Sequence, residues 1–164
     1  MKRFISIAST LLILSSCATK AYIPKNEKEA AKMQQVENAV ANGNYLIEIA
    51  NAVPMGGRLI NLNGNYSVEI RNDSAFVHLP FYGRAYTAPM GLNDGGIKFN
   101  APIDDYKLTT TKKGVYKANM DIRTNQDNYR IYLEIMPDGT STVRINSNNR
   151  SPMSYYGELE FDRE

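Results

Sequence analysis

Apolar and polar residues alternate with a period of two along most of the chain from Tyr45 onward. Successive side chains of a strand point to opposite faces, so this alternation predicts half-buried β-strands with one apolar and one polar face. The clearest runs span residues 66–71, 116–123, 128–135 and 155–161. Shorter runs around Ile60 and Ile97 bring the expected total to about nine or ten strands.

The joints between these runs are short and rich in turn-forming residues. Asn-Gly and Asp-Gly pairs accept the positive φ angles that tight hairpins need. The joints are Asn63-Gly64, Asn72-Asp73, Lys113-Gly114 and Pro137-Asp138-Gly139. Short joints pair neighbouring strands antiparallel, so we expect a mainly β fold, an antiparallel meander curled into a barrel or strongly curved sheet. A two-sheet β-sandwich is the alternative.

Ahead of Tyr45 the apolar spacing is that of a helix. Asn26 suits the N-cap position with Glu29 three residues later, and Gly43 suits the C-terminal cap. The apolar positions between them are Ala30, Met33, Val36 and Val40. This narrow stripe predicts one N-terminal helix that packs on a sheet edge or a barrel mouth.

The first residues have the order of a secretory signal peptide. Lys2 and Arg3 precede an apolar run that ends at Leu14, too short for a spanning helix of roughly 20 apolar residues. Residues 14–17, Leu-Ser-Ser-Cys, resemble the lipobox of bacterial lipoproteins. That resemblance implies cleavage before Cys17 and acylation of Cys17, including palmitate. An ordinary signal peptide with a chance cysteine is the alternative.

The chain then divides into residues 1–16 as the lipoprotein signal peptide, 17–26 as a tether and 27–164 as one β-rich domain. Cys17 is the only cysteine, so the domain is expected to be held by its core without disulfides. Removal of Lys2 and Arg3 from the 19 basic side chains leaves 17 against 17 acidic ones. This balance argues against a nucleic-acid partner, and membrane attachment is expected through the acylated N-terminus.

Few residues suggest catalysis. His78 is the only histidine, and it is interpreted as a surface or packing residue. A zinc site needs several Cys, His or acidic ligands, so we expect neither a metal nor another cofactor. The pairs Asp104-Asp105 and Glu158 with Glu160 are interpreted as solubilising charges. A fold that gathered distant acids in a cleft would instead favour glycosidase chemistry.

Tyrosine is abundant, with 11 residues in the chain. One set alternates with polar residues and is interpreted as inward-facing core: Tyr45, Tyr66, Tyr106, Tyr116, Tyr129 and Tyr155. Tyr132 and Tyr156 fall on the opposite face of their strands, where they are candidates for a contact surface.

Residues 78–102 form the least regular stretch of the domain. Pro80 is expected to end the preceding strand, and Gly83 to allow a bend or a close approach. As structure, the segment is a long connection pinned to the barrel by an arginine and aromatic rings. As function, it is a rim loop that contacts a ligand or partner. The candidate contact residues are Tyr82, Arg84, Tyr86, Met90, Arg150 and Tyr156.

Three blocks carry a resemblance to a known family: VPMGGRLINL (53–62), LPFYGRAYTAPMGLNDGGIKFNAPIDDY (79–106) and NNRSPMSYYGEL (148–159). They resemble an uncharacterised lipoprotein family of Bacteroidetes, known as domain of unknown function 4251, over essentially the whole mature domain. Members often read L-P-Y-F-G-R-A-Y, whereas this chain exchanges the two aromatics as Phe81-Tyr82. The resemblance implies location and fold type but no catalytic residue.

The sequence therefore predicts a lipid-anchored cell-envelope protein, a non-catalytic binding or structural module that contacts a small amphipathic ligand or an envelope protein. A hydrolase of cell-wall or glycan polymers is the alternative. No acidic run follows Cys17, so we expect an outer-membrane anchor facing the periplasm, with the cell surface as the alternative. An apolar cavity near Tyr82 and Arg84 would favour a small ligand, and a solid core with exposed aromatics would favour a protein partner.

Overall fold

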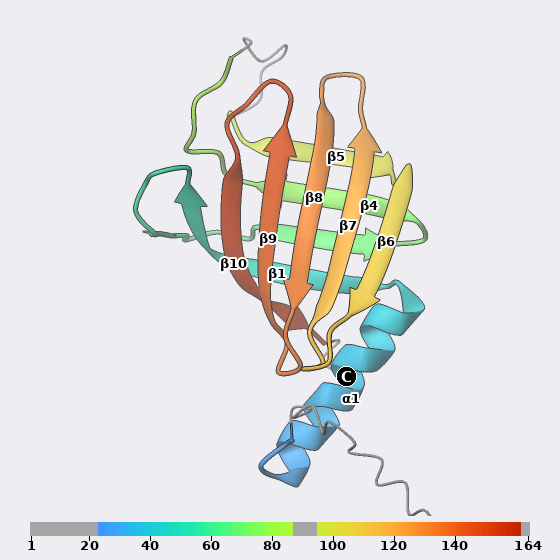
Figure 1. Ribbon diagram of the computed structural model, residues 1–164. Coiled ribbons are helices and arrows are strands. Elements are labelled where there is room, and N and C mark those ends of the chain that lie inside the picture. The colour runs from blue at the N-terminus through green and yellow to red at the C-terminus, as the bar shows by residue number, and fades with distance from the viewer. Residues whose placement is uncertain (1–22, 87–94, 162–164) are drawn as a thin grey trace, which may run out of the picture.

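The structure, a computed structural model, describes residues 23–86 and 95–161. It contains one helix followed by ten antiparallel strands in a single, strongly curled sheet (Figure 1). The mainly β fold expected from the sequence is confirmed, and its form is that of a half-barrel.

Helix α1 spans Glu27–Asn42 and has both predicted caps. The Asn26 side chain accepts a hydrogen bond from the Glu29 N–H at 2.8 Å, which satisfies one of the free amides of the first turn. Gly43 ends the helix in the left-handed conformation with φ 66°, where the lack of a Cβ removes the steric cost. Val36 and Val40 are buried against the sheet. In the described part of the chain, no helix is long and apolar enough to cross a bilayer.

The strands follow the predicted alternation. Their bounds are β1 Tyr45–Pro54, β2 Ile60–Asn61, β3 Ser67–Arg71, β4 Ser74–Leu79, β5 Ile97–Pro102, β6 Asp105–Thr110, β7 Tyr116–Arg123, β8 Asn128–Ile135, β9 Thr140–Ser147 and β10 Met153–Glu160. They are ordered β5-β4-β3-β1-β10-β9-β8-β7-β6, with β2 paired to β1. The front layer of Figure 1, β6 to β10, crosses the strands β1, β4 and β5 behind it.

The curl of the sheet is centred where β1 meets β10. The register of this pair shifts between Ile49 and Asn51, and such a bulge bends and twists the strand that contains it. Gly157 faces the bulge so closely that a Cβ would lie 1.9 Å from the Glu48 carbonyl oxygen. The two strands can approach this far because position 157 has no side chain.

Two pairs of sequence neighbours, β2 with β3 and β5 with β6, do not pair in space. Strands β5 and β6 lie at opposite ends of the strand order, although only two residues separate them. The Ile103 N–H donates to the Asp73 carbonyl, whereas the next N–H, of Asp104, donates to the Asp121 carbonyl, both at 2.9 Å. The chain thus passes from the rear layer to the front layer within two residues. The meander expected from short joints is interrupted here, which leaves a half-barrel.

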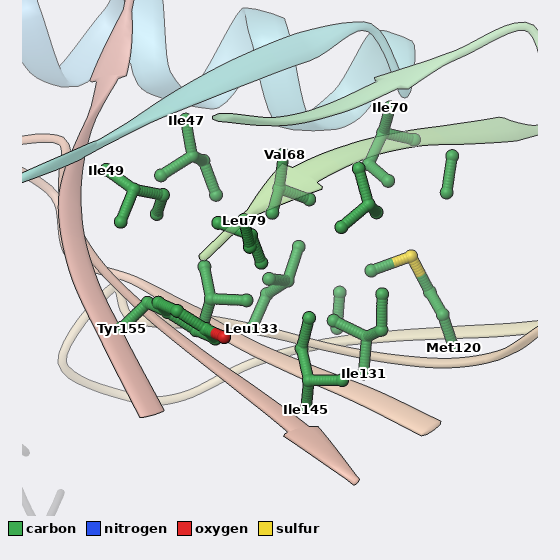
Figure 2. Close-up of a cluster of buried hydrophobic side chains, with 14 of the residues drawn as sticks. Ile47, Ile49, Val68, Ile70, Leu79, Met120, Ile131, Leu133, Ile145 and Tyr155 are labelled. Atoms are coloured by element: carbon green, nitrogen blue, oxygen red, sulfur yellow. The ribbon is translucent and has the colours of Figure 1, made fainter. Parts of the chain in front are cut away.

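The space between the layers is filled with side chains. Figure 2 shows residues of the β1–β3–β4 layer meeting residues of the front layer, with Ile47, Val68 and Ile131 fully buried. Of the tyrosines expected to face inward, Tyr45, Tyr129 and Tyr155 are buried. Tyr66 and Tyr116 are half-buried, and Tyr106 on edge strand β6 is 37% exposed. His78 is half-buried, with its ring 5.4 Å from that of Tyr66, in agreement with a packing role.

Candidate functional site

Residues 80–86, which we call the strap, continue from the end of β4 along the approach to β10. The strap is held mainly through its backbone. The Arg84 N–H donates to the Ser151 hydroxyl, and the Ser151 N–H returns a bond to the Arg84 carbonyl, both at 2.9 Å. The Tyr155 hydroxyl donates to the Pro80 carbonyl at 2.8 Å. Gly83 supplies the close approach expected of it, because a Cβ there would lie 2.2 Å from the Ser151 Oγ.

The arginine that holds this region in place is Arg150. Its Nη1 donates to the carbonyls of Gly95 and Gly96 at 2.7 and 2.9 Å. Its guanidinium lies 5.1 Å from the centre of the Phe81 ring, a cation–π distance. The sequence placed this pinning arginine in the strap itself, at Arg84, whose side chain is instead exposed.

The candidate contact residues do not form a single site. Tyr82 and Tyr86 are 47% and 60% exposed on the strap, on either side of Arg84. Arg150 joins them through a β-bridge between Ala85 and Arg150. Tyr156 is 40% exposed but projects from the opposite face of β10 to buried Tyr155. Two further predicted sites, Met90 and the lipidation site Cys17, lie outside the described residues.

A second region, which the sequence did not single out, is a hollow of about 540 Å³ where β7 ends and β8 begins. We call it the polar groove. Its lining is dominated by side chains that hydrogen bond through planar groups: Asp104, Asp105, Asp121, Arg123, Asn128, Arg130, Asn146 and Asn148. Ile122 and Tyr129 supply the apolar part of its wall.

Strand register brings four polar residues of the groove into one row. Asp105, Asp121, Arg130 and Asn146 lie directly opposite one another across β6, β7, β8 and β9. Side chains at directly opposed positions of an antiparallel sheet lie close enough to interact. Part of this row was predictable, because the turn between β7 and β8 sets Asp121 against Arg130.

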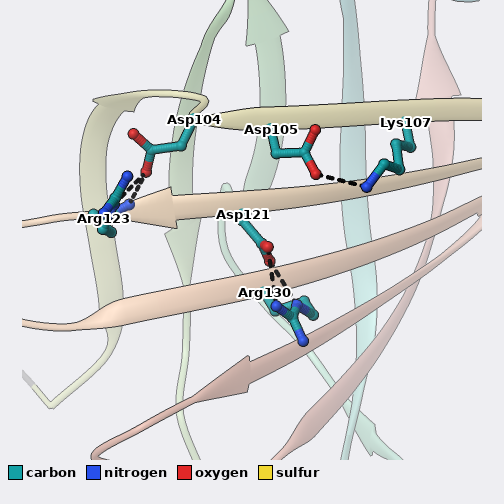
Figure 3. Close-up of polar contacts among 6 residues, drawn as sticks. All are labelled: Asp104, Asp105, Lys107, Asp121, Arg123 and Arg130. Atoms are coloured by element: carbon teal, nitrogen blue, oxygen red, sulfur yellow. Dashed lines mark hydrogen bonds and ion pairs between the residues drawn. The ribbon is translucent and has the colours of Figure 1, made fainter.

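Every aspartate of the groove has a basic partner (Figure 3). Arg130 binds Asp121 with two parallel bonds, Nε to Oδ1 at 2.5 Å and Nη2 to Oδ2 at 2.9 Å. The Asp104 Oδ2 accepts from the Arg123 Nε at 3.1 Å. Asp105 accepts from the Lys107 Nζ at 2.9 Å.

The pairing with Arg130 keeps the Asp121 carboxylate ionised. The hydrogen bond from Arg130 holds the pKa of Asp121 below its usual value, and the charge of Arg130 acts in the same direction. A general acid needs a carboxyl with a raised pKa, so Asp121 has the opposite tuning. Among the residues that the structure covers, no group of acids and histidines is arranged to hold a metal ion.

A buried aspartate stiffens one wall of the groove. Asp127 is 8% exposed and lies in the β7–β8 turn. Its carboxylate accepts from the Asn128 N–H at 2.8 Å, from the Asn148 N–H at 3.2 Å and from the Ser147 hydroxyl. The turn and the end of β9 are therefore tied together, which fixes the position of the groove lining.

One buried polar atom of the groove lining, the Asn146 Oδ1, lacks a hydrogen-bond partner within the described residues. Beyond Arg123 and Tyr129, which line both spaces, lies a second hollow of about 410 Å³ whose lining includes Lys98, Asn100 and Gln126. In that wall the Tyr129 ring stacks on Phe99 with centroids 4.5 Å apart.

Comparison with known proteins gives a family and a fold. The family described as "Domain of unknown function (DUF4251)" matches residues 27–159. The fold is similar to the crystal structure of a DUF4251 family protein from Bacteroides eggerthii, with a TM-score of 0.63 and 21% sequence identity. The similarity covers 80% of this chain and 90% of that one. No curated protein is significantly similar to the sequence.

Proposed function

The chain belongs to the DUF4251 family, and from the chemistry of the polar groove we propose that it is a lipid-anchored, non-catalytic binding module of the cell envelope. The observation that carries the binding role is the groove itself, in which three ion pairs hold planar hydrogen-bonding groups around an open hollow. Groups held in place before binding lose less entropy when a ligand arrives. The lowered pKa of Asp121, caused by its hydrogen bond with Arg130, suits recognition better than proton transfer.

The anchor part of the proposal rests on residues 14–17 and on the presence of a single cysteine. Expressed in a bacterium that processes lipoproteins, the full chain should lose residues 1–16 and gain the mass of acyl chains at Cys17. The Cys17→Ser variant should appear in the soluble fraction without that mass. Recovery of an unacylated wild-type chain would contradict the anchor.

The side of the membrane is a separate proposal. We expect the domain to face the periplasm from the outer membrane, because no acidic run follows Cys17. Protease added to intact cells should then leave the domain whole and digest it only after the outer membrane is opened. Removal of the domain from intact cells would place it on the cell surface.

The strap is a second candidate contact, for a protein partner. The interior is filled by buried side chains, while Tyr82 and Tyr86 remain exposed beside Arg84, and exposed aromatics with arginine are typical of protein interfaces. The full chain would be purified from its native envelope in detergent and the co-eluting species identified by mass spectrometry. Loss of that species in Arg130→Gln assigns binding to the groove, and loss in Arg84→Ala assigns it to the strap.

The gathering of three carboxylates in one hollow is the observation on which the hydrolase alternative rests. A hydrolase would release soluble fragments from envelope glycans or cell-wall polymer, and Asp121→Asn would abolish that release. The binding role instead predicts no release by the wild-type chain.

A further inference from the structure

The polar groove is close to electrically neutral, and this restricts the class of ligand. Its three aspartates are balanced by Arg123, Arg130 and by Lys107, which binds Asp105. A polyanionic ligand would meet three carboxylates, and a metal cation or polyamine would compete with three bases already in place. A neutral ligand rich in hydrogen-bonding groups leaves the ion pairs intact.

The groove offers donors and acceptors side by side. Arg130 uses only two N–H groups on Asp121, fewer than a guanidinium carries, and each carboxylate has further lone pairs. The side chains of Asp121 and Arg130 are 42% and 57% exposed, so both are within reach of a ligand. A hydroxyl donates one bond and accepts others, which makes adjacent hydroxyls the natural complement of a paired acid and base.

The Asn146 Oδ1 adds an acceptor that the protein itself does not satisfy. An unpaired buried polar atom lowers stability, so its presence in the row Asp105–Asp121–Arg130–Asn146 needs a compensating role. A donor from a bound ligand supplies one. Function at the expense of stability is a common feature of binding sites.

The size of the site fits a ligand longer than one ring. The groove volume of about 540 Å³ is in the range of small-molecule sites. The second hollow of about 410 Å³ shares Arg123 and Tyr129 with the groove lining, and Asn100 and Gln126 also line it. A chain of linked rings that passes over Arg123 would reach both spaces.

From these four observations we propose that the polar groove binds a neutral oligosaccharide. Its vicinal hydroxyls would bridge Asp121 and Arg130, and the half-buried Asn146 side chain would turn its Oδ1 toward one hydroxyl, which donates to it. This inference rests on the proposed binding role of the groove and names its ligand class.

The test uses the full chain, purified in a detergent that has no sugar headgroup. The probes are a glycan array that holds neutral linear oligosaccharides of glucose, mannose and N-acetylglucosamine together with sulfated and uronic-acid glycans. We expect binding to neutral members of the array. Calorimetry with the best of them should give a dissociation constant that barely changes with salt concentration, because no net charge is brought together.

Groove variants then locate the binding. Asp121→Asn with Arg130→Gln keeps the net charge, and it should weaken binding by about tenfold to a hundredfold through the loss of hydrogen bonds to charged groups. The matched control is Lys117→Gln together with Glu134→Gln. Lys117 pairs with Glu134 at 2.6 Å on the same sheet, with similar exposure, but lies outside the groove lining. This control should bind as the wild type does.

Asn146→Ala separates a ligand-binding role from a merely structural one. It should abolish or strongly weaken oligosaccharide binding while the urea midpoint stays the same or rises, because the unpaired buried oxygen is removed. A lowered midpoint with unchanged binding would overturn the role of Asn146 and with it the proposed arrangement.

The remaining outcomes separate the ligand class from the binding role. Binding only to sulfated or uronic-acid glycans, weakened by salt and by Arg130→Gln, overturns the neutral oligosaccharide but keeps the groove as a binding site. A requirement for Ca²⁺ also overturns it. No binding to any glycan, or binding that every groove variant retains, overturns the inference, and the co-purification of Arg130→Gln then decides the binding role independently.

Discussion

Single residues allow the two layers of this protein to meet, and Gly157 is the clearest case. It lies in β10, opposite the bulge of β1. A Cβ at this position would overlap the Glu48 carbonyl oxygen. The contact is with backbone, so a larger residue cannot be accommodated by a change of rotamer. The close approach of the two central strands depends on this one glycine.

We therefore expect Gly157→Ala to lower the free energy of unfolding by about 3 kcal/mol, the upper part of the range for overpacking in a core. Urea denaturation measures the change. Ser154→Ala, on the polar face of the same strand, is the matched control and should shift stability by less than about 0.5 kcal/mol. Equal effects of the two substitutions would show that the β1–β10 approach is not tight.

Two buried tyrosines make stability sensitive to alkaline pH. Burial raises the pKa of the Tyr45 and Tyr155 hydroxyls above the ordinary value of 10.0, and the neighbouring Tyr106 adds to the effect at Tyr45. The Tyr45 hydroxyl lies 3.3 Å from that of Tyr106. Both buried groups stay protonated in the folded state at a pH where the unfolded chain has lost these protons.

The sign of the pH effect follows from the raised pKa. The stabilisation is complete below about pH 10, and it is lost as the pH rises because unfolding then releases protons. The loss approaches about 1.4 kcal/mol per pH unit for each tyrosine. Urea midpoints measured across this range should fall steeply for the wild type and less steeply for Tyr45→Phe. Parallel curves would contradict the assignment.

Among the elements, the strap and the residues just before β5 are held by contacts with Arg150 and Ser151, which lie just before β10. Arg150 contributes two bonds to the Gly95 and Gly96 carbonyls and covers Phe81. Ser151 exchanges backbone and hydroxyl bonds with Arg84. The described parts of this irregular connection, residues 80–86 and 95–96, are thereby held with a single β-bridge, between Ala85 and Arg150.

Because these contacts are local, Arg150→Ala should loosen the region more than it lowers global stability. Bonds from a charged group are worth about 1.5–3 kcal/mol, so amide hydrogen exchange in residues 80–86 and 95–97 should speed up about tenfold or more. Arg144→Ala, an exposed arginine on β9, is the control and should leave exchange there unchanged. Uniform acceleration over the whole domain would show a global role instead.

For the whole molecule, the arrangement of β1 and β10 matters most. These two strands occupy the middle of the strand order, and β10 pairs with both β1 and β9. The front and rear halves of the sheet are thus joined by the last strand of the structure. Pairing between strands so distant in sequence makes folding depend on non-local contacts.

Deletion of residues 153–164 should therefore unfold the domain, since it exposes buried residues of both halves of the sheet. Deletion of residues 27–42, the span of α1, is the comparison. This helix buries only Val36 and Val40, so the domain should stay folded with a lower urea midpoint. Near-ultraviolet circular dichroism and binding of a hydrophobic dye distinguish the two results. A folded protein without β10 would contradict the central role of that strand.

Local patterns account for the elements but not for their assembly. The caps of α1 at Asn26 and Gly43, and the positive φ of Asn72 and Asp73 in the β3–β4 turn, follow from residues within a few positions. The polar groove could be predicted only in part, since the β7–β8 turn aligns Asp121 with Arg130. The contributions of Asp105 and Asn146 come from further pairings across the sheet.

The sequence alone determined one capped helix, the alternating strands and their tight turns, because side-chain periodicity and backbone preferences act over a few residues. Only the tertiary structure decided that β1 joins β10 and that β5 and β6 stay apart. It also decided that Arg150, rather than Arg84, holds the glycines ahead of β5. The physical reason is that pairing and register between distant strands depend on burying the two faces of the core together, a condition that no short stretch of sequence contains.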